Sequence, residues 1–339
     1  MNFDVQKQKR YLVDFPNGEV PVLKFSFHGG MNRLVFRCKD LWYIEVPEEC
    51  QSWVCVREEE GSAGTYQVQV EVNRYEGLRL RESTVLLCCW NERIRIPLMQ
   101  YPEFVPVEDP VFEAYLLRHY EGNSVGKLSQ ETASRITEID LGFGSPVVSL
   151  KGIEYMPNLK VIRCGGYPLT EPNRLTELDV RYNTALTVLE CGYNRLTSIK
   201  FGYHPALTQL ICGHNQLTSL DVRRMPKLFR LECGFNQLTE LDVRQNLNLS
   251  SMICHRNALT ALDLSQNRNL GYLECQWNQL VCLDLSQNLG LTTLMCTGNR
   301  LKALDVRLNS KLTYLDCCDN PLKTLEIGQQ QKLEHFFID

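Results

Sequence analysis

The segment LTVLECGYNRL, residues 186–196, carries the pattern that decides the fold. The same spacing of Leu, Leu, Cys, Asn and Leu returns every 21 residues, with one Met in place of Leu. The cysteines that mark it are Cys191, Cys212, Cys233, Cys254, Cys275, Cys296 and Cys317, and Cys164 precedes them after a longer interval. A fixed period of roughly 20–29 residues predicts stacked coils whose recurring apolar side chains form one continuous core.

The fifteen cysteines raise the question of disulfides or bound metal. Strand alternation directs Leu189 and Cys191 into the core and Glu190 outward. The ladder thiols then all point the same way, whereas a disulfide needs converging Cβ vectors. No CxxC pair of the kind that binds zinc is present. We therefore interpret the ladder cysteines as small apolar core residues.

The repeated motif Leu-x-x-Leu-x-Cys-x-x-Asn-x-Leu is typical of a leucine-rich repeat. On this pattern, residues 104–339 resemble the cysteine-ladder leucine-rich-repeat surface proteins that are related to internalins and common in Bacteroidetes. The resemblance implies an extracellular or outer-surface location. The first ten residues are polar and charged and show no leader, so a cytoplasmic location stays open.

A short helical cap is expected before the repeats. Asp109 and Pro110 form a helix start, and helical apolar spacing follows them. In the resembling family the cap often contains an EF-hand-like loop, which corresponds here to residues 121–132. Gly126 is kept, but Thr132 stands where calcium needs a bidentate carboxylate. Calcium is therefore not expected at this loop.

The first hundred residues alternate instead of repeating. Tyr66–Val72 and Arg93–Leu98 have the apolar–polar period of strands, and about seven short strands with no helical pattern predict an immunoglobulin-like β-sandwich. The order of Trp42, Trp53, Gly64, the strand that follows it and the closing strand resembles the BACON family. That resemblance implies a carbohydrate-binding module or a spacer.

The expected fold is mainly β, in three parts. Residues 1–102 form the BACON-like β-sandwich, residues 103–140 the linker and helical cap, and residues 141–339 the leucine-rich-repeat solenoid with 21-residue coils.

Two polar columns accompany the repeat. Asn residues such as Asn194 follow each ladder cysteine by three positions and are expected to satisfy backbone groups at the turn. Asp residues such as Asp242 recur in the second half of the coil, several with Arg two positions later. A charged binding strip is one interpretation. We favour a solvated ladder that neutralises itself between neighbouring coils.

Composition and motifs argue against several functions. Lys and Arg number 36 against 40 Asp and Glu, a net charge of −4 that does not suit a nucleic-acid binder. No apolar run is long enough to span a bilayer. The sequence contains no Gly-rich phosphate loop, HExxH or GxSxG, and its six His have no metal-ligand spacing. We expect a non-enzymatic protein without a metal or cofactor.

A partner-binding surface is predicted on the exposed strand face. Large side chains stand where the repeat does not require them, and aromatic residues with Arg are enriched in binding hot spots. The candidate residues are Tyr193, His214, Phe235, Arg256, Trp277, Tyr272, Tyr314, Glu190, Glu232 and Glu274. The alternative is that the rings pack against the turn or against each other.

The predicted function is that of a cell-surface binding protein. Its partner is expected to be a host or bacterial surface protein, or a glycan. The alternative is an intracellular leucine-rich-repeat scaffold that organises other proteins.

Overall fold

The fold is known from a computed structural model that describes residues 12–16, 20–77, 79–90, 92–121, 126–142, 144–166, 174–328 and 333–339. The chain forms two compact units. The first contains residues 1–106 and 127–131, and the second contains residues 107–126 and 132–339. No helix within the described ranges is long and apolar enough to cross a membrane.

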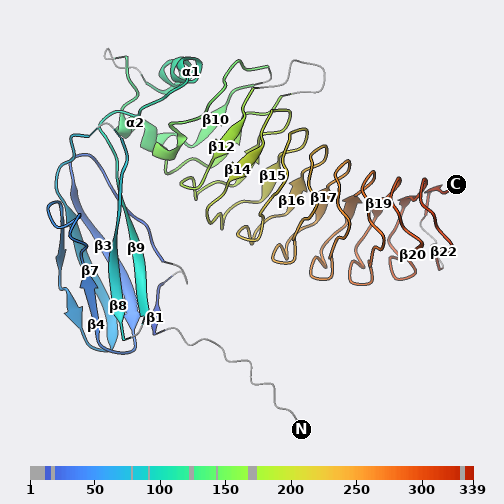
Figure 1. The fold of residues 1–339 in the computed structure, drawn as a ribbon, viewed down its shortest axis with the longest axis horizontal. Coiled ribbons are helices and arrows are strands. Elements are labelled where there is room, and N and C mark those ends of the chain that lie inside the picture. Colours follow the sequence, from blue (N-terminus) through green and yellow to red (C-terminus); the bar gives the residue numbers. More distant parts are fainter. Residues whose placement is uncertain are drawn as a thin grey trace, which may run out of the picture. The chain divides into compact units, whose positions relative to one another are not determined.

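The first unit contains two sheets that share one core (Figure 1). One sheet has the order β1 (Val13–Asp14), β3 (Gly30–Cys38), β7 (Gly64–Val72), β5 (Val54–Arg57). The other has the order β2 (Leu23–Phe25), β9 (Glu92–Gln100), β8 (Arg81–Cys89), β4 (Trp42–Glu45), β6 (Glu60–Gly61). Neighbours pair antiparallel except β2, which runs parallel to β9.

Alternation along the strands builds this core. In β7, Val68, Val70 and Val72 are buried, as the period of two predicts. Phe36 of β3 meets Trp42 of β4 edge to face, with ring centroids 4.9 Å apart. The two sheets are therefore joined by apolar side chains that the alternating pattern places on their facing sides.

The second unit begins with α1 (Pro110–Tyr120), followed by α2 (Gln130–Arg135) and the 3-10 helix η1 (Ile153–Tyr155). Asp109 caps α1, because its Oδ1 accepts hydrogen bonds from the backbone N–H groups of Val111 and Phe112. Its Oδ2 accepts from the backbone N–H groups of Val148 and Ser149. One buried carboxylate thus ties the start of the helix to the segment before η1.

A parallel sheet runs the length of the solenoid, one strand per coil (Figure 1). Its strands, in order, are β10 (Glu138–Asp140), β11 (Val161–Arg163), β13 (Val188–Glu190), β15 (Gln209–Ile211), β16 (Arg230–Glu232), β17 (Ser251–Ile253), β18 (Tyr272–Glu274), β19 (Thr293–Met295), β21 (Tyr314–Asp316) and β23 (His335–Phe337). Two short parallel pairs lie in the second halves of coils: β12 (Glu177–Asp179) with β14 (Ser198–Lys200), and β20 (Ala303–Asp305) with β22 (Thr324–Glu326). This confirms the predicted β-solenoid, with about nine turns of about 21 residues.

The ladder cysteines are core residues, as predicted. Leu189 and Cys191 are fully buried, and the backbone N–H of Cys191 donates to the carbonyl of Ile211 on the next coil. All eight ladder thiols are buried and unbridged. Burial raises the pKa of Cys212 and of Cys254 to about 12, so these thiols are unreactive.

The predicted Asn column bridges neighbouring coils. The amide nitrogen of Asn236 donates to the carbonyls of Cys212 and Cys233, 3.1 Å from each, and its Oδ1 accepts from the backbone N–H of Leu217. A second, buried Asn column was not predicted. Its members are Asn183, Asn246, Asn267, Asn288 and Asn309, whose amides also donate to backbone carbonyls.

Candidate partner-binding surface

Five of the predicted site residues lie at one turn position. Tyr193, His214, Phe235, Arg256 and Trp277 have φ values between 51° and 56°, in the left-handed region. Each strand ends one residue before the ladder cysteine, so the chain has already turned two residues after it. These residues therefore lie in the left-handed turn that follows each strand and not within the strand itself.

These five residues form a continuous column, which we call the aromatic–Arg stack. The rings of Tyr193 and His214 are stacked with centroids 4.0 Å apart, and those of His214 and Phe235 are stacked at the same distance. The guanidinium carbon of Arg256 lies 5.1 Å from the Phe235 centroid and 5.6 Å from that of Trp277. The rings therefore do pack against each other, as the alternative interpretation held.

The stack is also accessible to solvent. Phe235 is 38% exposed and Trp277 is 46% exposed. Burial lowers the pKa of His214, and nearby His255 lowers it further, so this ring is neutral at pH 7. Arg256 is therefore the cation of the stack, and it lies between two aromatic rings.

Gly298 occupies the same turn position on the next coil. Its φ is 64°, and a Cβ at this residue would lie 2.5 Å from Cε3 of Trp277. The Trp277 ring thus occupies the space that a larger residue at 298 would need. Gly298 and the equivalent Asp319, with φ 52°, are residue types that tolerate this conformation.

Gly298→Ala is expected to lower the free energy of unfolding by about 1–2 kcal/mol. The alanine Cβ would be strained at this left-handed backbone position, and it would displace the Trp277 ring. Urea unfolding and tryptophan fluorescence would measure the two effects. Gly271→Ala is the control, since a Cβ there would meet atoms no closer than 3.7 Å. Equal stability of the two variants would show that the ring does not depend on Gly298.

The predicted acidic residues lie on the strand face, and each has a basic side chain beside it. The Nδ1 of His255 lies 3.2 Å from Oε2 of Glu274, and the hydroxyl of Tyr272 donates to the same carboxylate. The hydrogen bond with His255 lowers the pKa of Glu274, while burial raises that of Tyr272 to about 12. Sequence reasoning missed His255, whose ring also meets Phe235 edge to face, with centroids 5.1 Å apart.

The remaining predicted residues have similar local partners. Glu232 forms an ion pair with Arg230, and Oε1 of Glu190 lies 3.6 Å from Nε of Arg163. Tyr314 packs against the rings of His335 and Phe337. The structure therefore brings five predicted residues into the stack and leaves the other five as locally paired groups on the strand face.

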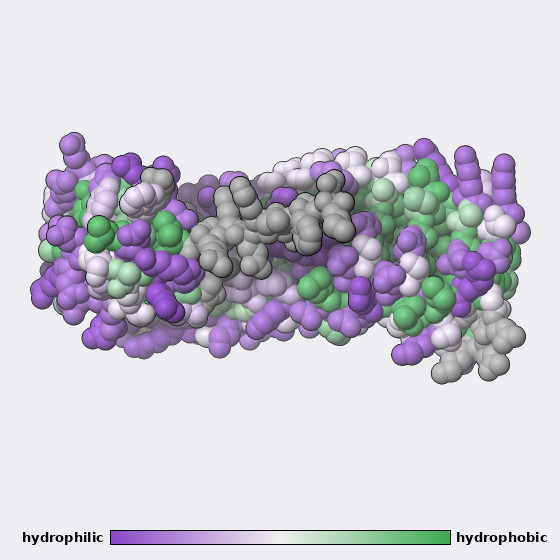
Figure 2. Space-filling model, turned by 90° about the horizontal axis from the view of Figure 1, so that it is seen from below, coloured by the Kyte–Doolittle hydropathy of each residue, from purple (hydrophilic) through white to green (hydrophobic). Residues whose placement is uncertain are grey.

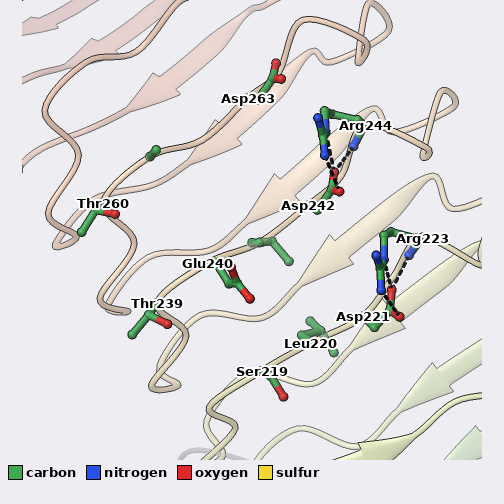
Figure 3. A pocket seen from close by; sticks show the side chains of 12 residues that line it. Ser219, Leu220, Asp221, Arg223, Thr239, Glu240, Asp242, Arg244, Thr260 and Asp263 are labelled. Carbon is green, nitrogen blue, oxygen red and sulfur yellow. Dashed lines mark hydrogen bonds and ion pairs between the residues drawn. The ribbon is translucent and has the colours of Figure 1, made fainter.

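The second halves of three coils surround a hollow of about 530 Å³ (Figure 3). Asp242 and Arg244 form a bidentate pair there, which lowers the pKa of Asp242 to about 2, and Asp221 and Arg223 form another. Each of these close pairs joins residues of a single coil, and attraction between neighbouring coils adds to them, as between Arg244 and Asp263. The side chain of each Arg reaches back to the Asp two residues earlier, so two of the carboxylates that line the hollow are neutralised. The carboxylates of Glu240 and Asp263 line it as well.

Exposed hydrophobic side chains form another feature. On the face shown in Figure 2 they gather toward the C-terminal end of the solenoid. In these coils the large exposed aliphatic residues include Val281, Leu289 and Leu308. The last coil also exposes Phe336 and Phe337. The aromatic–Arg stack is the stronger candidate because it combines aromatic rings with an Arg on successive coils.

The EF-hand-like loop at residues 121–132, where calcium is not expected, is described only in part, because residues 122–125 lie outside the described residues. Thr132, at its last ligand position, lies within α2. Within the described part of the chain, no group of three or more His, Cys, Asp or Glu residues is arranged to hold a metal ion.

The chain is similar to several solved structures. The functional domain of InlJ from Listeria monocytogenes, which includes a cysteine ladder, is 30% identical over 63% of this chain and 55% of its own, with a TM-score of 0.40. YopM from Yersinia enterocolitica is 28% identical over 54% of this chain and 38% of its own, with a TM-score of 0.47. An internalin, InlF, from Listeria monocytogenes is 17% identical over 68% of this chain and 95% of its own, with a TM-score of 0.34.

This chain thus spans about half of the InlJ domain and less than half of YopM. No protein-family model matches the sequence, and no curated protein matches it.

Proposed function

We propose that the chain is a non-enzymatic binding protein that engages a partner protein through the aromatic–Arg stack. The observation that carries the proposal is the choice of residues at the left-handed turn. Gly is the least strained residue there, as at Gly298, and a left-handed conformation costs other residues about 1–2 kcal/mol. Five successive coils instead hold Tyr, His, Phe, Arg and Trp, which are partly exposed. Strain of this kind is characteristic of functional sites.

The stacking geometry favours a protein over a glycan. Sugars bind aromatic residues through open ring faces, whereas the faces of His214 and Phe235 are covered by their neighbours in the stack. What the stack offers are ring edges and the cation of Arg256. Such edges and donors suit the mixed apolar and polar surface of a protein.

Combined Phe235→Ala and Trp277→Ala substitutions are expected to reduce partner binding at least about tenfold, because removal of a hot-spot residue costs 2 kcal/mol or more. The melting temperature should fall by only about 5 °C, since both rings are partly exposed. Proteins captured from host surface extracts and from bacterial envelopes would be compared quantitatively between the wild type and this variant.

Arg223→Ala with Arg244→Ala serves as the matched control, because it removes two large side chains from the other half of the coils. The control should capture the same protein as the wild type. Equal capture by the stack variant would contradict the proposed surface, and its unfolding would identify the rings as packing residues.

The finer assignments rest on the sequence resemblances. We propose that the two-sheet unit is an immunoglobulin-like, BACON-like module, that α1 belongs to a helical cap, and that the parts extend over residues 1–102, 103–140 and 141–339. We also propose an outer-surface location, which loss of the protein to a protease added to intact cells would test. Protection of the protein until lysis would favour the intracellular scaffold.

A further inference from the structure

Two cysteines stand at one end of the two-sheet unit, on opposite sheets. Cys38 is the last residue of β3, and Cys89 is the last residue of β8. Only residues 39–41 separate Cys38 from β4, and Trp42, the first residue of β4, is the register partner of Cys89. Both cysteines therefore lie where the chain crosses from one sheet to the other.

Both side chains point into the shared core. Cys38 continues the inward series of Leu34 and Phe36, and Cys89 continues that of Val85 and Leu87. The two cysteines are 1% and 0% exposed, and the thiol of Cys38 is close enough to that of Cys89 to raise its pKa.

Cys88 is a natural contrast to this pair. It is also buried, but it does not belong to the shared core cluster. Its thiol lies near the hydroxyl of Tyr43, which is the register partner of Cys88 on β4. Adjacent residues of a strand face opposite sides of a sheet, so only Cys89 is directed at the facing sheet.

We propose that Cys38 and Cys89 form a disulfide between the two sheets when the protein folds in the presence of a disulfide oxidant such as oxidised glutathione. The thiolate of one cysteine attacks a glutathione sulfur, which forms a mixed disulfide and releases one glutathione thiolate. The thiolate of the other cysteine then attacks the protein sulfur and releases the second glutathione. The protein loses two electrons and two protons, and oxidised glutathione becomes two reduced molecules.

The disulfide is expected to form at a particular stage, while the chain folds. Burial and the neighbouring Cys38 thiol raise the pKa of Cys89 to about 12, so the native protein contains little of the reactive thiolate. Oxidation is therefore expected during folding and not after it. The bond would close a long loop of the first unit, which is the situation in which a cross-link restricts the unfolded chain most.

The test uses the full chain, refolded from urea with oxidised and reduced glutathione and digested without reduction. Mass spectrometry should find a peptide pair joined through Cys38 and Cys89 in the wild type and in Cys88→Ser. The oxidised wild type should melt roughly 10 °C or more above the reduced protein in the transition of the two-sheet unit. Cys38→Ala and Cys38→Ser should lose this redox-dependent difference, and having both variants covers the case in which one fails to fold.

Two results would overturn the inference. One is a wild type in which both thiols are still alkylated after refolding in the oxidising buffer. The other is a disulfide that joins Cys38 or Cys89 to a different cysteine. That result would indicate that the two thiols do not come close enough to form a bond with each other.

Discussion

Asn278→Ala is expected to lower the free energy of unfolding of the solenoid by about 3 kcal/mol. The amide nitrogen of Asn278 donates to the carbonyls of Cys254 and Cys275, and its Oδ1 accepts from the backbone N–H of Leu259. All of these bonds are buried and two of them join neighbouring coils. Removing the side chain takes a hydrogen-bond partner from several buried backbone groups. Each buried group left without a partner costs about 1–3 kcal/mol of stability.

Asn269→Ala is the matched control for this prediction. Asn269 is exposed and donates one hydrogen bond, to the carbonyl of Leu247, so its loss should cost less than about 1 kcal/mol. Urea unfolding followed by far-UV circular dichroism would compare both variants with the wild type. A loss at Asn278 no larger than that at Asn269 would show that the column does not hold the coils together.

Asn278→Asp separates hydrogen bonding from packing. The carboxylate keeps the shape and can still accept the bond from Leu259, but it cannot donate to the carbonyls of Cys254 and Cys275. It should therefore be at least as destabilising as Ala at neutral pH, where a buried charge faces two carbonyl oxygens. Near-normal stability of this variant would contradict the role given to the amide nitrogen.

The coil could be predicted from the sequence because the residues that repeat along the chain are the same residues that are buried in the core. Each 21-residue coil needs apolar residues at the positions that face its neighbours, so Leu189 and Cys191 repeat wherever the core repeats. The N-terminal sheets followed from alternation for the same reason. The two-residue strands β1 and β6 are too short to carry a period, and hydrogen bonding to longer neighbours defines them.

The position of the stack could not be predicted from the period alone. The turn after each strand is closed by hydrogen bonds to the next coil, such as that from the N–H of Tyr193 to the carbonyl of Gly213, 3.0 Å away. These backbone hydrogen bonds between coils hold the turn residue in its left-handed conformation. Backbone bonds do not depend on apolar side chains, so they add no periodic apolar pattern to the sequence. The available signal was Gly298 and Asp319, two types that tolerate positive φ in a column otherwise filled by large side chains.

Two positions of the unpredicted Asn column hold other residues, His204 and Met225, which lie between Asn183 and Asn246. The imidazole of His204 is fully buried. Its Nε2 accepts a hydrogen bond from the backbone N–H of Gly202, 3.3 Å away, which requires an unprotonated Nε2. Burial lowers the pKa of His204 from 6.5 to about 4, an effect that the nearby Asn183 backbone only partly opposes.

This ring should make the solenoid sensitive to acid. Above pH 6.5 the ring is neutral in both states and adds no pH dependence. Between pH 6.5 and about 4 the unfolded chain binds a proton that the folded chain does not, so stability falls as the pH falls. The full difference corresponds to about 3 kcal/mol, which is reached once the pH is near the folded pKa.

His204→Asn is expected to remove this component, because Asn does not titrate and matches the neighbouring column. The free energy of unfolding would be measured by urea denaturation at pH 7.5 and pH 4.5 for both proteins. The wild type should lose about 2–3 kcal/mol more than the variant over this interval. Carboxylates such as Asp242 contribute equally to both and cancel in the comparison. The same loss in both proteins would mean that the ring is protonated in the folded state at a pH close to its ordinary pKa, and that the buried column accommodates an imidazolium.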